Sequence, residues 1–220
     1  MEKITLTKKD FKDTDSYYKE YCGKVDVSDF GGTIEIEGSL GWVRFDRLKA
    51  KGGIYAEAGT GIEAGAGIEA GWGIKAGWGI KAGWGIKAGE GIKAGEGIKA
   101  GWGIEAGWGI EAGTGIKAGW GIEAGEGIKA GEGIEAGWGI EAGTGITCKL
   151  ALSFKYNLFA GVACWKKAEG NDKKITCGRL EGGTVCYGDV VETGMPDETK
   201  AKTVKVRLSG GEIVSGEIVE

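Results

Sequence analysis

Several residue types that carry chemistry in proteins are missing or scarce in this sequence. Histidine is absent from the 220 residues, and proline occurs once, at Pro196. Without histidine the chain lacks the usual general base, a common zinc ligand and every Ser-His arrangement. Carboxylates are abundant, but in the central part of the chain they fall at regularly repeated positions, as expected for a solvated surface. The sequence therefore predicts a protein that is not an enzyme and that holds no cofactor.

Cysteine is also too sparse and too irregularly spaced to form a recognisable site. There are five cysteines, and no two of them form a Cys-x-x-Cys pair. Such a pattern fits neither a zinc site nor a regular disulfide framework. Cys148 and Cys177 fall at positions that alanine occupies in neighbouring units, so we interpret them as small buried thiols, with a disulfide as the second interpretation. No metal site is predicted.

Long apolar segments are missing as well. The longest one, Leu158 to Trp165, has eight residues and contains a glycine, which is too short to span a bilayer. The chain begins Met1-Glu2-Lys3 and shows no apolar core of a signal peptide. Together with reduced cysteines, these features favour a cytoplasmic protein without a membrane partner.

Glycine, in contrast, accounts for 47 of the 220 residues, and most of it belongs to one repeated hexapeptide. Between residues 59 and 146 the unit Gly-Ile-(Glu/Lys)-Ala-Gly-(Trp/Glu/Thr/Ala) recurs almost without interruption. A short fixed period is typical of repeat architectures. In an extended backbone the Ile and Ala of each unit lie on one face and the charged residue on the other. The paired glycines predict a sharp corner, and we expect them to supply positive φ angles there.

Other folds fit this repeat poorly. Two glycines in every six residues would cost about 1 kcal/mol each in a helix interior. Their alternating spacing of two and four residues is not that of collagen. The regular Ile and Ala count against disorder, which stays an alternative for a sequence so rich in glycine. A strand-and-corner unit cannot bury its own apolar face, so it must stack on copies of itself and form a β-solenoid.

The number of units in each coil decides the shape of the solenoid. Three units give a triangular coil of 18 residues, whereas two give a flat coil of about 12 residues. Residues 84–104 recur as 120–140, a shift that suits both. Three inward Ile and three inward Ala fill a triangular core better than a flat one, whose sheets would lie about 10 Å apart. We therefore predict an all-β, triangular β-solenoid of about 18 residues per turn.

The chain divides into four expected segments. Residues 1–31 are expected to form an N-terminal cap, with a short helix over 10–22 and a strand, and residues 32–165 the solenoid, with its regular core at 59–146. One longer strand is predicted over Leu150–Leu158. Residues 166–194 are expected to form a hairpin, with its loop at 166–174, and a terminal coil that caps the solenoid. Residues 195–220 are predicted to be a linker followed by a C-terminal β-hairpin of strands 203–208 and 212–219.

The Ile-x-Ala-Gly-x-Gly unit resembles the hexapeptide-repeat left-handed β-helices, although here the aliphatic residue comes first. The Gly-x-Ile-x-Ala rhythm is also similar to that of bactofilins, which are right-handed solenoids that polymerise end to end. The flanking segments 39–45 and 175–180 resemble uncharacterised bacterial or phage repeat proteins. The resemblance covers about residues 32–190 and implies a solenoid of open handedness. The acyltransferases and carbonic anhydrases of the hexapeptide family act through histidines, so their activities do not carry over.

Charge is balanced along the repeat. The whole chain has a net charge of −4, and within residues 59–146 seven Glu and seven Lys occupy the outward strand positions, with four more Glu at corners. So mixed a surface lacks the basic stripe that is typical of proteins that bind nucleic acid. Nucleic acid is therefore not expected as a partner.

Tryptophan is the feature that points beyond a scaffold. Seven of the nine tryptophans lie at the corner positions between glycines. With 18 residues per turn, one column of corners collects Trp84, Trp102, Trp120 and Trp138, about 4.8 Å apart. In one interpretation the indoles cover the glycines of neighbouring corners and bury apolar area. In the other they form an aromatic platform that binds a partner protein or a glycan.

These observations favour a non-enzymatic structural or macromolecular-interaction protein. Its rigid solenoid would present a surface to another protein or to a second copy of itself. Two alternatives remain. The chain could be a phage-type inhibitor or decoy that binds a host protein; DNA mimicry is one form this could take, although the intermixed lysines count against it. It could also bind a glycan along the tryptophan column.

Overall fold

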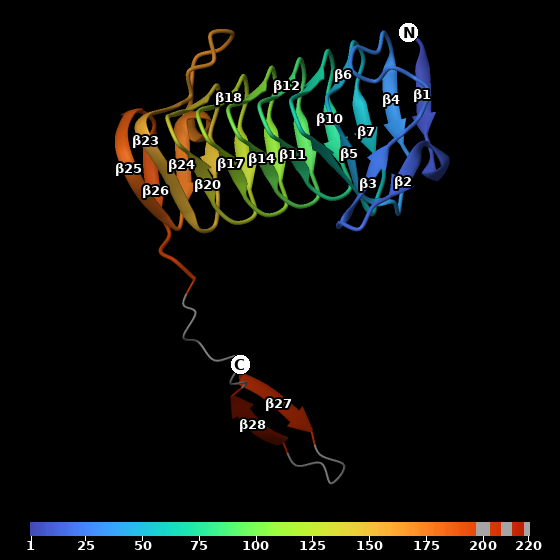
Figure 1. Cartoon of the computed structure of the whole chain (residues 1–220). Coiled ribbons are helices and arrows are strands. Elements are labelled where there is room, and N and C mark those ends of the chain that lie inside the picture. The colour runs from blue at the N-terminus through green and yellow to red at the C-terminus, as the bar shows by residue number, and fades with distance from the viewer. Residues whose placement is uncertain (197–202, 208–212, 218–220) are drawn as a thin grey trace.

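The computed structural model describes residues 1–196, 203–207 and 213–217, and it shows an all-β solenoid (Figure 1). Successive coils pair in parallel: Ile74 lies opposite Ile92, and Ile92 lies opposite Ile110. Each coil therefore takes 18 residues and contributes three strands. This confirms the predicted triangular coil and excludes the flat coil of two units.

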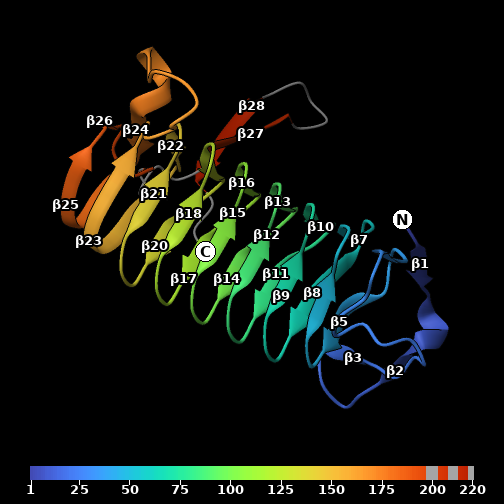
Figure 2. The same ribbon diagram turned by 90° about the horizontal axis from the view of Figure 1, so that it is seen from above.

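The strands stack into three columns, which we call faces 1, 2 and 3 and which Figure 2 shows from above. Face 1 consists of β5 (Gly41–Phe45), β8 (Thr60–Ala64), β11 (Ile80–Ala82), β14 (Ile98–Ala100), β17 (Ile116–Ala118), β20 (Ile134–Ala136) and the first half of β23 (Ala151–Ala160). Face 2 consists of β6 (Leu48–Ala50), β9 (Ile68–Ala70), β12 (Ile86–Ala88), β15 (Ile104–Ala106), β18 (Ile122–Ala124), β21 (Ile140–Ala142) and the second half of β23. Face 3 consists of β1 (Lys3–Leu6), β4 (Thr33–Ile36), β7 (Ile54–Ala56), β10 (Ile74–Ala76), β13 (Ile92–Ala94), β16 (Ile110–Ala112), β19 (Ile128–Ala130), β22 (Ile146–Thr147), β24 (Lys174–Cys177) and β26 (Asp189–Glu192).

The core is built from the Ile and Ala of each unit, as predicted. Ile110 and Ala112 are 1% and 3% exposed, and the other Ile and Ala of the repeat are buried in the same way. Each buried Ile contributes on the order of 1.5–3 kcal/mol relative to an exposed one. Because every unit supplies the same pair, each coil is held by the same three large and three small side chains.

The corner glycines correct one expectation. No glycine between residues 60 and 146 has a positive φ; the glycines that do lie at the two ends, such as Gly41 and Gly59. The corners instead need glycine because successive coils approach closely. A Cβ on Gly101 would overlap the carbonyl oxygen of Gly83 in the preceding coil. Absence of a side chain, not a left-handed backbone, is what these positions require.

The helix predicted over residues 10–22 is wrong. Only residues 8–10 turn, as a short 3₁₀ helix (Lys8–Asp10), and the chain then forms a hairpin of β2 (Phe11–Asp13) and β3 (Tyr18–Tyr21). In this hairpin Phe11 lies opposite Tyr21, and both rings pack against Phe45 with centroids 5.8 and 5.4 Å away. The hairpin covers the core of the first coil, and β3 pairs with the open edge of β5. Pairing a sheet edge outweighed the weak local preference for a helix.

At the other end of the solenoid, β23 confirms the predicted long strand and bends across two faces. The hairpin predicted around residues 166–174 is wrong, because β24 pairs in parallel with β22 and not with β23. The segment between β23 and β24, which includes a second 3₁₀ helix (Gly170–Lys173), carries the chain to the next face and stands out from the body in Figure 1. β25 (Arg179–Tyr187) then pairs with β23 along both faces.

The predicted C-terminal hairpin is confirmed for its strands. β27 (Thr203–Arg207) and β28 (Ile213–Glu217) pair in antiparallel register. The predicted linker is described only as far as residue 196, and the turn of the hairpin lies outside the described residues.

Candidate functional site

The four predicted column tryptophans form a continuous ladder at the corner between faces 1 and 2. Trp84, Trp102, Trp120 and Trp138 follow one another with ring centroids 6.1, 6.1 and 5.9 Å apart, and adjacent rings are stacked at 17–21°. The backbone fixes this spacing, because the N–H of Trp102 donates to the carbonyl oxygen of Trp84 at 3.0 Å and the next rung repeats the bond. Each stacked pair contributes about 0.5–1.5 kcal/mol beyond its buried area.

Tyr156 adds a fifth rung that the sequence pattern did not reveal. It lies in the middle of β23, where the strand bends around the corner, and its ring centroid is 4.5 Å from that of Trp138. Lys155 Nζ lies over the Tyr156 ring, 5.3 Å from its centroid. The signal was available, since Tyr156 follows Trp138 by one coil length. It was hidden because no glycine marks this corner.

The ladder is exposed to solvent. Its four indoles are 55–61% accessible, so they do not lie flat over the corner glycines as one interpretation of the sequence expected. An unbroken row of exposed aromatic rings is an apolar patch of the kind that marks interaction sites in soluble proteins. The other three corner tryptophans form no such row: Trp72 and Trp108 alternate with Glu90 and Glu126 in one column, and Trp78 is followed by Glu96 and Thr114 in the other.

A groove of about 710 Å³ runs beside the ladder on face 2. The indoles form one wall, and glycines such as Gly103 and Gly121 lie between that wall and the strands. The other wall is the column of outward charged residues on face 2, which lies three residues after the ladder in every coil. This face 2 column is Glu69, Lys87, Glu105, Glu123 and Glu141.

The face 2 column ends in three acidic residues in register. Glu105 lies opposite Glu123, and Glu123 opposite Glu141, an arrangement that repels within the sheet. Lys87 relieves only the first of them, with Nζ 2.6 Å from Glu105 Oε1; this hydrogen bond raises the pKa of Lys87. Within residues 1–196, Glu123 and Glu141 form no ion pair.

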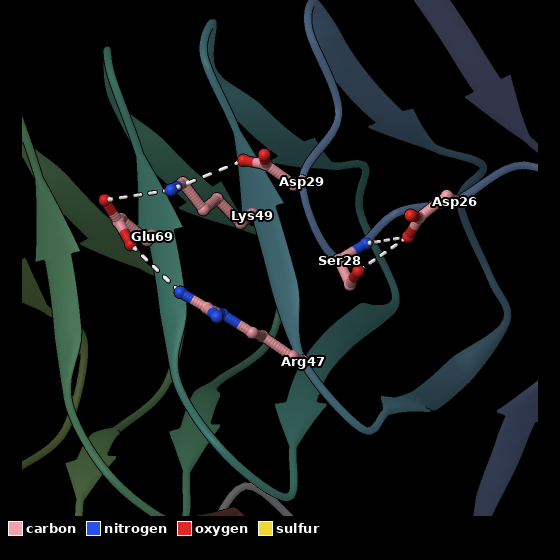
Figure 3. A network of polar contacts seen from close by, with 6 residues as sticks. All are labelled: Asp26, Ser28, Asp29, Arg47, Lys49 and Glu69. Carbon is pink, nitrogen blue, oxygen red and sulfur yellow. Dashed lines mark hydrogen bonds and ion pairs between the residues drawn. The ribbon is translucent and has the colours of Figure 1, made fainter.

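At the other end of the groove, ion pairs compensate the charge of the first residue of the face 2 column, Glu69 (Figure 3). Glu69 is held between Arg47 Nη2 at 3.6 Å and Lys49 Nζ at 3.8 Å, and Lys49 also approaches Asp29 at 3.3 Å. Beside this network Asp26 accepts hydrogen bonds from the backbone and the hydroxyl of Ser28. The uncompensated charge of the groove is therefore confined to the part beside the later rungs of the ladder.

The fold sorts charges that the sequence intermixes. The outward column on face 1 is Glu63, Lys81, Lys99, Lys117 and Glu135, and that of the repeat on face 3 is Lys75, Lys93, Glu111 and Lys129. Faces 1 and 3 are thus net positive and face 2 is net negative. The outward charges expected from the sequence balance over the repeat as a whole, whereas each face carries both signs with one of them in excess.

The cysteines and the possible metal ligands are the other candidate groups in the described residues. Cys148 and Cys177 are buried, as predicted, and burial raises the pKa of the Cys148 thiol to about 12. In residues 1–196 and the two C-terminal strands, no group of three or more Cys, Asp or Glu side chains is placed to hold a metal ion. No helix in the described part is long and apolar enough to cross a membrane.

Comparison with known proteins identifies no relative. No protein-family model, curated protein or solved structure matches the chain. Its function must therefore be inferred from the surface of the solenoid itself.

Proposed function

We propose that the chain is a non-enzymatic, cytoplasmic interaction protein that binds another polypeptide through the ladder and the groove beside it. The observation that carries this proposal is the straight row of four indoles, each more than half exposed, on a rigid scaffold. Tryptophan is enriched among the residues that dominate the energy of protein interfaces. A preformed rigid row also binds without the entropic cost of ordering flexible side chains.

The spacing of the rings favours a polypeptide over a glycan. Sugars stack on the faces of aromatic rings, and a ring inserted between two indoles needs about 3.5 Å on each side. Neighbouring centroids in the ladder are 5.9–6.1 Å apart, which leaves no space for insertion. A polypeptide can instead lie along the outer edges of the indoles and place its own charges against the face 2 column.

We also propose an architectural relationship to the hexapeptide-repeat and bactofilin-like solenoids, supported by the six-residue rhythm and the buried Ile–Ala pair of each unit. An experimentally determined handedness tests it. A left-handed coil would favour the hexapeptide-repeat proteins, and a right-handed coil would favour bactofilins. A solenoid in which Ile and Ala do not point inward would contradict both.

Site-specific photo-crosslinking in the cells that express the protein tests the binding function. p-Benzoylphenylalanine is placed at Trp120, in the middle of the ladder, or at Lys129, an outward position on face 3 at a similar height. We expect a defined covalent product with a second polypeptide from position 120 and none from position 129. The mass of that product distinguishes a second copy of the chain from another protein.

Two results would count against this function. Equal products from both positions would mean that the ladder is not a preferred contact. Absence of any product at position 120, while the protein remains folded, would mean that the indoles serve only the stability of the solenoid.

A further inference from the structure

We infer that the polypeptide bound in the groove is a second copy of this chain, whose face 1 docks against face 2 of the first. This rests on the proposed function, because it names the partner of the same groove. The contact would join two solenoids side by side with their axes parallel.

The outward columns of the two faces are complementary in sign. Over the four coils from Glu63 to Lys117, face 1 reads one negative and three positive charges; over the four coils from Lys87 to Glu141, face 2 reads one positive and three negative charges. Both columns are built on the same 18-residue coil, so successive charged residues in each column are about 4.8 Å apart along the solenoid axis. A parallel neighbour displaced along the axis therefore matches the two columns charge for charge: Glu63 with Lys87, Lys81 with Glu105, Lys99 with Glu123, and Lys117 with Glu141.

The match extends beyond the regular repeat. One coil earlier, Arg44 of face 1 would meet Glu69 of face 2, and one coil before that, Glu20 on β3 would meet Lys49. The central pair uses charges that are free within residues 1–196, since neither Lys99 nor Glu123 forms an ion pair there. The second copy would thus neutralise the acidic run that the solenoid leaves uncompensated.

The same arrangement brings the ladders together. Faces 1 and 2 share the ladder corner, and the chain circulates in the same direction in two parallel copies. Their ladders therefore lie on the same edge of the contact. In the register set by the charges, Trp84 of the second copy lies at the height of Trp102 of the first, and Trp138 lies at the height of Tyr156. Face 3 does not border the ladder, so docking through it would leave the indoles apart.

This contact uses different surfaces on the two copies. After the first contact one copy still has a free face 1 and the other a free face 2, so further copies can add. The assembly stops growing if the copies close into a ring and otherwise grows as an open array. We expect assemblies whose size grows with concentration and shrinks with salt, because exposed charges are screened.

Sedimentation velocity of the full-length protein at rising concentration tests the inference. The wild type should associate at low salt. The reversals Glu123→Lys/Glu141→Lys on face 2 and Lys99→Glu/Lys117→Glu on face 1 should each weaken association by about tenfold or more. A mixture of these two variants should associate again, and so should one chain that carries all four reversals, because both restore opposite signs across the contact.

A matched control is Lys75→Glu/Lys129→Glu on face 3, which makes the same change in net charge as the face 1 variant. It should associate like the wild type, and circular dichroism should show that every variant is folded. A wild type that stays monomeric, or reversals whose mixture does not restore association, would overturn the inference. Loss of association in the face 3 variant alone would also overturn it and would assign the contact to face 3.

The failure of this inference can be separated from failure of the proposed function. A monomeric protein that still crosslinks another polypeptide through position 120 keeps the proposed function and loses the second copy as partner. Charge-dependent association that persists when all four ladder tryptophans are alanine keeps the second copy and removes the ladder from the contact.

Discussion

The two glycines of the corner at Trp102 have different roles although the repeat makes them look equivalent. The glycine before the corner residue packs against the coil below: a Cβ on Gly101 would overlap the carbonyl oxygen of Gly83. The glycine after it has more room, since a Cβ on Gly103 would lie 3.4 Å from the carbonyl oxygen of Gly121. One glycine is required by packing, and the other forms the open surface next to the ladder.

Paired substitutions measure this difference. Gly101→Ala should destabilise the protein by about 3 kcal/mol or more, because the coils must separate to admit the methyl group. Gly103→Ala should cost less than about 1 kcal/mol, since the contact is ordinary and alanine restricts the unfolded chain. Urea unfolding of the two variants beside the wild type gives both values. Equal losses would show that the glycines are needed for backbone conformation and not for close packing.

Thiol chemistry separates the cysteines in the same way. Cys22, Cys164 and Cys186 are exposed and should react with a thiol reagent in the native protein, whereas Cys148 and Cys177 should react only after unfolding. Burial raises the pKa of Cys148 from 9.0 to about 12, so the folded state favours the neutral thiol. Its stabilising effect is present below pH 9 and is lost as the pH rises toward 12.

The alkaline effect can be isolated with Cys148→Ala. The difference in unfolding free energy between wild type and this variant should be constant below pH 9 and should shrink above it. A difference that does not change with pH, or rapid native labelling of all five thiols, would contradict the buried placement.

At the scale of the strands, the period of the sequence determined most of what the structure shows. A residue and its second neighbour share a strand face, so Ile-x-Ala could be assigned inward from the sequence alone. The ladder followed once the coil length was set. The sequence also contains the distribution of charge over the three faces, since every third unit belongs to the same face. It becomes visible only when residues one coil apart, such as Lys87 and Glu105, are compared.

The strands that failed prediction lie where periodicity ends. Residues 10–22 carry aromatic residues and possible caps that suit a short helix, and only the open edge of β5 and the uncovered Phe45 select a hairpin. Those are contacts between segments far apart in the sequence. The loop before β24 was misread for the same reason, because a parallel partner one coil away cannot be seen in local sequence.

The ladder predicts energetic coupling between neighbouring rungs. In a double-mutant cycle, Trp102→Ala and Trp120→Ala should couple by about 0.5–1.5 kcal/mol, since their rings stack. Trp108 lies on a different corner, and its cycle with Trp120 should show no measurable coupling. Urea unfolding of the single and double variants gives both terms. Coupling of Trp108 with Trp120, and not of Trp102 with Trp120, would contradict the column assignment.

At the scale of the whole molecule, every hexapeptide places the same Ile and Ala in the core, so the units are interchangeable there. Removing one coil, residues 103–120, should shorten the solenoid and leave the ladder continuous through Trp84, Trp102 and Trp138. Removing one unit, residues 103–108, should also leave every Ile and Ala buried. It would, however, rotate everything downstream by one face and place Trp120 and Trp138 on another corner.

The two deletions should therefore differ in surface properties and not in folding. We expect both proteins to unfold cooperatively with strand-rich circular dichroism. Only the 18-residue deletion should retain coupling across the junction, now between Trp102 and Trp138. Failure of the six-residue deletion to fold would show that the three faces are not interchangeable in the core.

Because the units are interchangeable in the core, the gene can gain or lose units without loss of the fold. Near-identical units invite unequal recombination, and residues 84–104 already recur almost unchanged as 120–140. Events of any number of units would yield a folded product, yet only those in multiples of three units keep each surface column in phase. Natural variants of this protein should therefore differ in length by whole coils, and selection for that step would itself reveal that the surface, and not the fold, is what is being preserved.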